Sequence, residues 1–279
     1  MKQIKKAKIK DYTTYKLTGE IKEVFIPENI DELVKLLSNL DNYKIIGNGS
    51  NLIISESFNV PLIKLSSFDN LKIDGNIVTV GAGYSLMKMC RCCADKGLSG
   101  LEFASGIPGS VGGAIYMNAG AYGKEIKDVL KSVTVIDGVN IKKMDASSLD
   151  FGYRSSIFKK KKYICVEAEF ELKEGDKKKI LSDMKNIMEK RRGVQPLEYP
   201  SAGSVFRNSS QPAGKLIEDI GLKGLRVGDA EVSIKHANFI VNRGLASAED
   251  VIELIEIIKT KIKDKYGIDL ELEQEILKG

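Results

Sequence analysis

The sequence predicts a mixed α+β protein built from three packed units. Two observations carry this prediction. Short apolar strand patterns alternate with amphipathic helix patterns along the chain, and a stretch flanked by glycine and proline at 193–200 separates the last part from the rest. The 279 residues exceed what one minimal core needs. We therefore expect units over residues 1–60, 61–193 and 194–279.

The first unit has a β-α-β pattern. We expect a short apolar strand over 21–26, then a helix capped by Asn29, then a second strand that ends at Ile46. Glu32 follows Asn29 by three residues, which is the spacing of a capping box. The second strand stops at a run of glycine, asparagine and serine, so a change of backbone direction is expected there.

The middle unit is richer in strands. A helix from about Ser85 is expected to end at Gly97, because glycine adopts the left-handed conformation that closes helices. A charged helix over 177–192 leads to the boundary. Each of two hairpins turns at an Asp-Gly pair. The strands and hairpins are expected over 60–65, 71–80, 133–141 and 163–172.

The last unit mixes strands with one long helix. Strands are expected near Val232 and Phe239, and Ser247 caps an amphipathic helix with Asp250 completing the capping box. A terminal strand is expected over 270–276. Alternation along such a strand places three acidic side chains on one face: Glu271, Glu273 and Glu275.

Composition limits the function classes. The net charge of +5 comes from 43 basic and 38 acidic residues, and lysine is scattered, which does not indicate nucleic-acid binding. No signal peptide follows Met1, and no apolar stretch is long enough to span a bilayer. Cys90 and Cys93 match CxxC inside a helix with no second pair, so a packed, reduced helix is favoured over a metal or redox site. We expect a cytoplasmic protein without a metal.

Two glycine-rich elements indicate a nucleotide site. The first, residues 47–52, follows a strand. Its glycines at alternate positions let backbone N–H groups fold around a pyrophosphate. It lacks the third glycine of the GxGxxG fingerprint, and a plain turn is the alternative. The second, 104–123, holds six glycines and no charge, as a backbone wrapped against a large flat ligand requires. Both fit one extended dinucleotide.

Two further turns could carry chemistry. Arg154 follows Tyr153, and in a turn the two side chains could converge, with the guanidinium fork suited to a carboxylate or enolate oxygen. Ser204 follows Gly203 in an expected tight turn and can offer its hydroxyl to a ligand. The only histidine is His236, so no Ser-His-Asp triad is present. An ordinary structural arginine and a turn serine are the alternatives when each motif is taken alone.

Together these elements resemble the UDP-N-acetylenolpyruvoylglucosamine reductase (MurB) family, in its shorter form without an extra substrate-loop insertion. The resemblance runs from Tyr12 to the end of the chain. Five motifs carry it, in the family's order and spacing. They are residues 47–52, residues 106–113 with 118–123, residues 153–156, residues 200–206 and residues 213–217.

The resemblance implies a two-subdomain FAD-binding fold of the vanillyl-alcohol-oxidase type over 1–60 and 61–193, followed by a C-terminal α+β substrate domain over 194–279. It implies that NADPH reduces a noncovalent FAD, and that a UDP-sugar enolpyruvate then takes a hydride at C3 and a proton at C2. The implied cofactor contacts are Gly47, Asn48, Gly49, Ser50, Asn51, Leu52, Ser105, Gly106, Gly109, Ser110, Gly112, Gly113, Asn118 and Gly120. The implied substrate contacts are Tyr153, Asn208, Lys215 and His236.

The resemblance also implies catalytic roles. Ser204 would donate the proton, while Arg154 and Glu273 would polarise the substrate's carboxyl group and stabilise the intermediate. Glu273 is chosen over its two acidic neighbours from its distance to Gly279. A packed histidine is an equal alternative for His236.

The chain departs from the family pattern at two places. Lys16-Leu-Thr-Gly19 replaces a frequent Arg-x-Gly-Gly, and Gln274 replaces a usual valine after Glu273. Two rival functions stay open. Another flavin oxidase of the same fold need not combine Ser204, Arg154 and a terminal glutamate, and a binding module without catalysis would be colourless. The residues indicate no oligomeric state, and the preference for NADPH comes from the resemblance alone.

Overall fold

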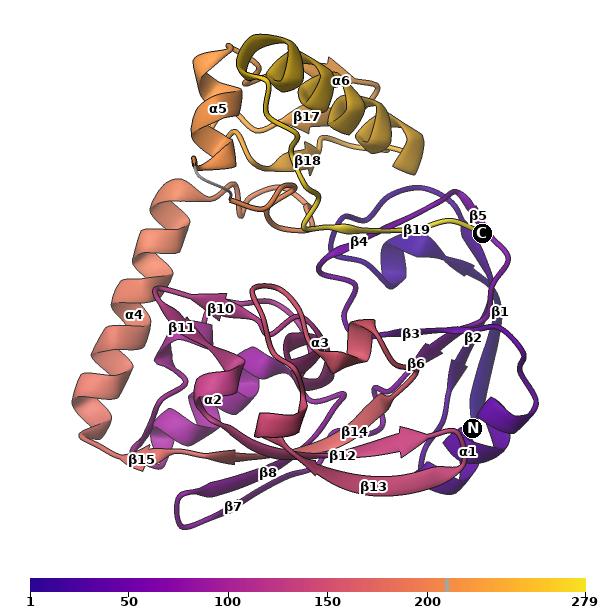
Figure 1. The fold of residues 1–279 in the computed structure, drawn as a ribbon, viewed down its shortest axis with the longest axis vertical. Helices are drawn as coiled ribbons and strands as arrows, with labels where there is room; N and C mark the ends of the chain where they lie inside the picture. The colour runs from indigo at the N-terminus through magenta and orange to yellow at the C-terminus, as the bar shows by residue number, and fades with distance from the viewer. Residues whose placement is uncertain (209–210) are drawn as a thin grey trace. The chain divides into compact units, whose positions relative to one another are not determined.

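The computed structural model describes residues 1–208 and 211–279 and is mixed α+β (Figure 1). The chain forms two compact units. The first consists of residues 1–3, 24–48 and 61–191. The second consists of residues 4–23, 49–60 and 192–279. The expected division at residues 60 and 193 stays a prediction.

The first unit contains a parallel β-α-β arrangement. It comprises the end of β2 (Glu20–Ile26), whose residues before Val24 belong to the second unit, together with α1 (Ile30–Ser38), β3 (Lys44–Ile46) and β6 (Leu62–Lys64). β6 lies between β2 and β3, with Leu62 opposite both Val24 and Lys44. Parallel strands need such a crossover connection, and α1 supplies it between β2 and β3.

The capping box expected at α1 is half formed. The Asn29 side chain accepts the N–H of Glu32 at 2.9 Å, as expected. The Glu32 carboxylate accepts the N–H of Glu28 at 2.9 Å and pairs with the Met1 ammonium at 2.7 Å. The prediction of a reciprocal bond to Asn29 was therefore wrong, because an ammonium group attracts the carboxylate more strongly than a neutral backbone N–H does.

An antiparallel sheet forms the core of the first unit, and both expected Asp-Gly hairpins are confirmed in it. Its strand order is β13-β12-β14-β8-β7. The strands are β7 (Leu71–Asp74), β8 (Ile77–Gly81), β12 (Leu130–Asp137), β13 (Asn140–Asp145) and β14 (Ile164–Glu171) (Figure 1). α2 (Leu86–Asp95) contributes Cys90 and Cys93 to the same apolar core. These buried thiols act as small apolar side chains.

The second unit contains a three-stranded antiparallel sheet and two helices. Its sheet has the order β16-β17-β18, and α6 packs against it. These elements are α5 (Ala213–Asp219), β16 (Arg226–Val227), β17 (Ala230–Val232), β18 (Ile240–Asn242) and α6 (Ala248–Tyr266). Near the chain end, β19 (Glu275–Leu277) pairs in parallel with β4 (Leu52–Ile54).

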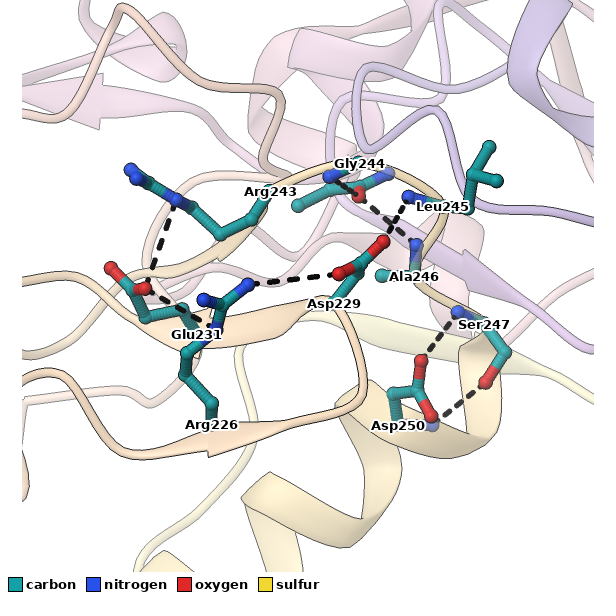
Figure 2. A network of polar contacts seen from close by, with 10 residues as sticks. Arg226, Asp229, Glu231, Arg243, Gly244, Leu245, Ala246, Ser247 and Asp250 are labelled. Atoms are coloured by element: carbon teal, nitrogen blue, oxygen red, sulfur yellow. Dashed lines mark hydrogen bonds and ion pairs between the residues drawn. The ribbon is translucent and has the colours of Figure 1, made fainter.

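A polar network holds the segment that enters α6 (Figure 2). Glu231 of β17 pairs with Arg226 at 3.5 Å and with Arg243 at 3.7 Å. At the helix start, Asp250 N–H donates to Ser247 Oγ at 3.0 Å and Ser247 N–H donates to the Asp250 carboxylate at 2.9 Å. The predicted capping box is confirmed here, and it gives acceptors to the N–H groups of Ser247 and Asp250, which have no partner within the helix.

The predicted terminal strand was too long. Only residues 275–277 form β19, while Leu272 makes an isolated antiparallel bridge with Phe206. Glu271 and Glu273 therefore lie outside the strand, and the alternation that placed them on one face with Glu275 does not apply. The physical reason is that the segment changes its pairing partner near residue 274, which a polar-apolar pattern does not reveal.

Several elements were not expected from the sequence. They include β1 (Lys2–Lys8), α3 (Val111–Tyr116) and α5. α4 (Lys177–Val194) is the expected charged helix. The short strands are β5 (Ser57–Phe58), β9 (Leu98–Ser99), β10 (Gly120–Ala121), β11 (Lys124–Glu125) and β15 (Lys173–Glu174). Within residues 1–208 and 211–279, no helix combines the length and apolar character needed to cross a membrane.

Candidate active site

The first glycine-rich element is the turn between β3 and β4. Gly49 has φ +63°, and a Cβ built on it would lie 2.1 Å from the Tyr12 carbonyl oxygen. Thr14 N–H donates to the Gly49 carbonyl at 3.2 Å and holds the two segments together. Only glycine permits both this conformation and this approach.

The same turn presents backbone donors. Among the residues that the structure describes, the N–H groups of Asn48 and Gly49 donate to no protein acceptor. Successive unpaired N–H groups in a turn form a concave anion site. The turn is therefore chemically suited to a pyrophosphate, as the sequence predicts.

The second glycine-rich element packs against the first through Gly47. A Cβ on Gly47 would lie 2.5 Å from Ser110 Oγ. Ser110 is the N-cap of α3, and its Oγ accepts the N–H of Gly113 at 3.2 Å. Gly112 N–H donates to the Ala82 carbonyl at 2.8 Å. Both N–H groups are thus used within the protein, so neither is a free donor for a cofactor.

The earlier part of the second element is buried. Ser105 Oγ donates to the Glu102 carbonyl at 2.8 Å. A Cβ on Gly106 would lie 2.5 Å from Cδ of Arg191, which belongs to α4. Gly109 has φ +148°, a backbone conformation open to glycine. Sequence reasoning missed Arg191, because nothing local connects the end of a charged helix to this loop.

Each of the two elements by itself has a feature that FAD binding needs. The turn at 48–49 offers donors for a pyrophosphate, and the second element has no charged side chain over residues 104–123. Close backbone packing without side chains is what a large planar group requires. The fourteen cofactor contacts named above remain predictions, with these geometric features in their support.

Arg154 lies in a tight two-residue turn with Tyr153. Gly152 and Ser155 exchange backbone hydrogen bonds of 3.0 and 3.2 Å across this turn. Arg154 has φ +53°, and its guanidinium carbon lies 5.1 Å from the centre of the Tyr153 ring. One guanidinium nitrogen donates to the Gly120 carbonyl at 3.0 Å. The two side chains therefore converge as the turn prediction required, and the arginine is held by a stacked ring and a fixed acceptor.

The side chain of Asn118 anchors the turn that carries Tyr153 and Arg154. Its side chain is fully buried, and its amide donates to the Gly152 carbonyl at 3.0 Å and to the Glu125 carboxylate at 3.0 Å. Its carbonyl oxygen accepts the N–H of Lys127 at 3.1 Å. Every polar atom of the side chain is thus bonded to protein. A direct cofactor contact by Asn118 would have to use its backbone.

Ser204 and Glu273 belong to neighbouring segments of the second unit. Glu273 N–H donates to the Val205 carbonyl at 2.9 Å, and Arg207 N–H donates to the Glu271 carbonyl at 2.9 Å. Gly203 has φ +76°, as the predicted tight turn before Ser204 requires. The predicted proton donor Ser204 and the predicted carboxylate residue Glu273 therefore lie in two neighbouring, hydrogen-bonded backbone segments.

The three tail glutamates differ in their surroundings. The Glu271 side chain is 76% exposed and pairs with Arg207 at 3.5 Å. Glu275 lies in β19. Glu273 is held by its backbone, since the side-chain amide of Asn51 donates to the Glu273 carbonyl at 2.9 Å. Asn51 thereby connects the first glycine element to the segment that carries Glu273. This connection supports the choice of Glu273, which stays a prediction.

The predicted substrate residues of the second unit gather around α5. Asn208 accepts the N–H of Ala213 at 3.2 Å, and Lys215 is exposed on the helix. A Cβ on Gly214 would lie 3.5 Å from the His236 ring. His236 also packs edge-on against Phe239, with ring centroids 4.8 Å apart. Burial lowers the pKa of His236, so the imidazole is neutral at pH 7. In the first unit, Tyr153 is exposed.

Two family models match the chain. The model for the C-terminal domain of UDP-N-acetylenolpyruvoylglucosamine reductase matches residues 195–277, and an FAD binding domain model matches residues 21–139. The chain is also similar to a UDP-N-acetylenolpyruvoylglucosamine reductase of Pseudothermotoga lettingae. The two are 44% identical over 270 residues, which is 96% of this chain and 95% of the relative.

Other relatives agree. The Bacillus subtilis UDP-N-acetylenolpyruvoylglucosamine reductase is 46% identical over 205 residues, covering 72% of this chain and 68% of that protein. The crystal structure of the Thermus caldophilus enzyme is 38% identical, superimposes with a TM-score of 0.87, and covers 99% of this chain and 98% of that one. The predicted α+β class and the predicted FAD-binding fold are thereby confirmed. The chain belongs to the UDP-N-acetylenolpyruvoylglucosamine reductase family.

Proposed function

We infer that Arg154, Ser204 and Glu273 carry the chemistry of this chain, which reduces UDP-N-acetylglucosamine enolpyruvate to UDP-N-acetylmuramate in peptidoglycan synthesis. The reaction and the use of FAD and NADPH follow from membership of the family. FAD, when bound, supplies the hydride chemistry that links NADPH to the double bond of the substrate. The roles of the protein residues are derived below.

Arg154 provides a fixed positive charge for the substrate. Its guanidinium keeps one hydrogen bond to the Gly120 carbonyl and one stacked ring, which leaves little freedom to reorient. Negative charge builds on the enolate and carboxylate oxygens during hydride addition at C3. A preorganised arginine stabilises that charge more in the transition state than in the ground state.

Ser204 delivers the proton to C2, and Glu273 acts beside it. The observation that carries this assignment is the 2.9 Å bond from Glu273 N–H to the Val205 carbonyl, which fixes the two segments in one register. A serine hydroxyl is a weak acid, so it protonates only a strongly basic centre such as an enolate carbon. In this proposal Glu273 polarises the substrate's carboxyl group and helps Arg154 to stabilise the intermediate.

The roles in binding FAD and substrate are divided between different parts of the chain. We propose that residues 1–60 and 61–193 bind FAD and that residues 194–279 bind the substrate, with Lys215 and Asn208 beside α5 supporting its diphosphate. Lysine and amide side chains are ordinary phosphate partners. We place the reaction in the cytoplasm, where NADPH is available. Neither nucleic acid nor membrane insertion has a part in this proposal.

Ser204→Ala tests the assignment. The variant should keep flavin reduction by NADPH at the wild-type rate and lose substrate-dependent flavin reoxidation by roughly a hundredfold or more. Stopped-flow absorbance at the flavin band measures both half-reactions. Ser201→Ala, in the same segment, is the matched control and should leave both rates unchanged. Equal losses in the two half-reactions would remove Ser204 from the proposed role.

A further inference from the structure

Gln274 is a buried amide next to the proposed catalytic serine. Its side chain is only 3% exposed. The amide nitrogen donates to the Ala202 carbonyl at 3.1 Å and to the Gly203 carbonyl at 3.0 Å. These are the two carbonyl groups that immediately precede Ser204. One side chain therefore satisfies both acceptors of the turn from which Ser204 projects.

The orientation of this amide is fixed by chemistry. Carbonyl oxygens only accept hydrogen bonds, so the NH2 group must face Ala202 and Gly203. The Gln274 carbonyl oxygen then points the other way, into the interior. Among residues 1–208 and 211–279, that oxygen has no hydrogen-bond partner within the ordinary limits of distance and angle. The buried Tyr15 hydroxyl lies close to the Gln274 side chain. Gln274 thus keeps its two bonds to the serine turn even though its own oxygen is left unsatisfied.

The backbone of Glu273 and Gln274 bonds the chain on the other side of Ser204. The N–H groups of Glu273 and Gln274 both approach the Val205 carbonyl, at 2.9 and 3.4 Å. The tail segment therefore bonds the chain before Ser204 through a side chain and the chain after Ser204 through its backbone. Gly203, with φ +76°, gives the turn little stiffness of its own. The position of Ser204 depends on these outside bonds.

We propose that Gln274 is a positioning residue for Ser204, which holds the hydroxyl at the distance from C2 that proton delivery requires. This inference rests on the proposed role of Ser204. Gln274 touches neither substrate nor cofactor in this role, and acts only through the Ala202 and Gly203 carbonyls. Small displacements of a catalytic group are costly, since a shift of about 1 Å can slow a reaction by about a hundredfold.

Gln274→Leu removes both donations at similar side-chain volume. The flavin should still be reduced by NADPH at a rate within about twofold of wild type, while reoxidation by UDP-N-acetylglucosamine enolpyruvate should slow by about tenfold to a hundredfold. The substrate concentration for half-maximal reoxidation should change little, because no substrate contact is lost. Tyr15→Phe is the matched control, since it alters the same buried region without touching the serine turn, and both of its rates should match wild type.

Gln274→Glu gives a second readout through pH. A carboxylate cannot donate to the two carbonyls, whereas a protonated carboxyl can donate to one of them. The reoxidation rate of this variant should therefore rise relative to wild type as pH falls. This variant also decides the matter if Gln274→Leu does not retain FAD. A flat ratio across pH 5 to 8 would show that the amide's donors are irrelevant to the step.

The outcomes separate the two proposals. Slow reoxidation in Ser204→Ala with normal reoxidation in Gln274→Leu would overturn the positioning role alone. Normal reoxidation in Ser204→Ala would overturn the proposed function and, with it, the premise of the positioning role. A parallel fall of both half-reactions in Gln274→Leu would mark Gln274 as a general stabiliser of the fold and contradict the proposal.

Discussion

Gly47→Ala is expected to destabilise the first unit through the cap of α3. The added Cβ would lie 2.5 Å from Ser110 Oγ, well inside contact distance, while Ser110 Cβ would be at an acceptable 3.6 Å. The hydroxyl can rotate away, but it then releases the N–H of Gly113, which it accepts at 3.2 Å. The clash is thus converted into a lost helix cap.

The magnitude follows from that conversion. Loss of a serine N-cap costs about 1 kcal/mol, with a range of about 0.5–2 kcal/mol. Ser110→Ala should cost the same, because it removes the same bond. In the double variant the obstructing oxygen is absent, so Gly47→Ala should add nothing further. The double-mutant cycle should therefore show a coupling of about 1 kcal/mol.

Urea unfolding of the four proteins, with FAD in excess, measures the three differences in free energy of unfolding. Release of FAD on dilution gives an independent readout, since both residues belong to the predicted cofactor site. Flavin should leave Gly47→Ala faster than wild type. Strictly additive costs in the cycle would refute the reasoning, because they would mean that the methyl group added at position 47 and the Ser110 hydroxyl do not compete for space.

Three further predictions concern buried groups. Burial holds the pKa of His236 below its ordinary value of 6.5, so the unfolded chain binds the proton more readily than the folded chain. The folded state therefore loses stability as pH falls below about 6.5. His236→Leu should flatten this pH dependence, as measured by urea unfolding midpoints from pH 5 to 8. Burial raises the pKa of Cys93 and of Cys165 to about 12. At pH 8 a thiol reagent should therefore label only the half-exposed Cys92 in the native protein, and all four cysteines in urea. Mass spectrometry counts the labels. Asn118→Leu removes the donations to the Gly152 carbonyl and the Glu125 carboxylate and takes the acceptor away from the Lys127 N–H. It should lower the free energy of unfolding by about 1–3 kcal/mol, and a loss below about 0.3 kcal/mol would contradict its anchoring role.

Local chemistry made much of the fold predictable. The hairpins turn at Asp-Gly pairs because these residues tolerate the backbone angles of a tight turn, and the capping box of α6 joins residues only three apart. The glycine requirement at residue 49 was also visible in the sequence. The cause of that requirement, the nearby Tyr12 carbonyl, was not.

The candidate site was predictable as a set of residue types and less so as an arrangement. Gly203 and Ser204 indicated a turn, and Tyr153 with Arg154 another, because each pair is adjacent in the chain. The family resemblance placed Asn118 among the cofactor contacts, which stays a prediction, and only the folded chain shows that each polar atom of its side chain bonds to a protein group.

Patterns in the chain were enough to establish the class of fold, the family and the residue types available for chemistry, because these depend on neighbours within a few residues or on motifs in a fixed order. Only the folded chain shows which segments residues 271–277 bond to. Residues 271–274 lie against 205–207, residues 275–277 pair with β4, and Gln274 bonds the turn before Ser204. Those partners are roughly seventy to over two hundred residues away in the chain, and a polar-apolar pattern carries no information about which distant segment a strand will meet.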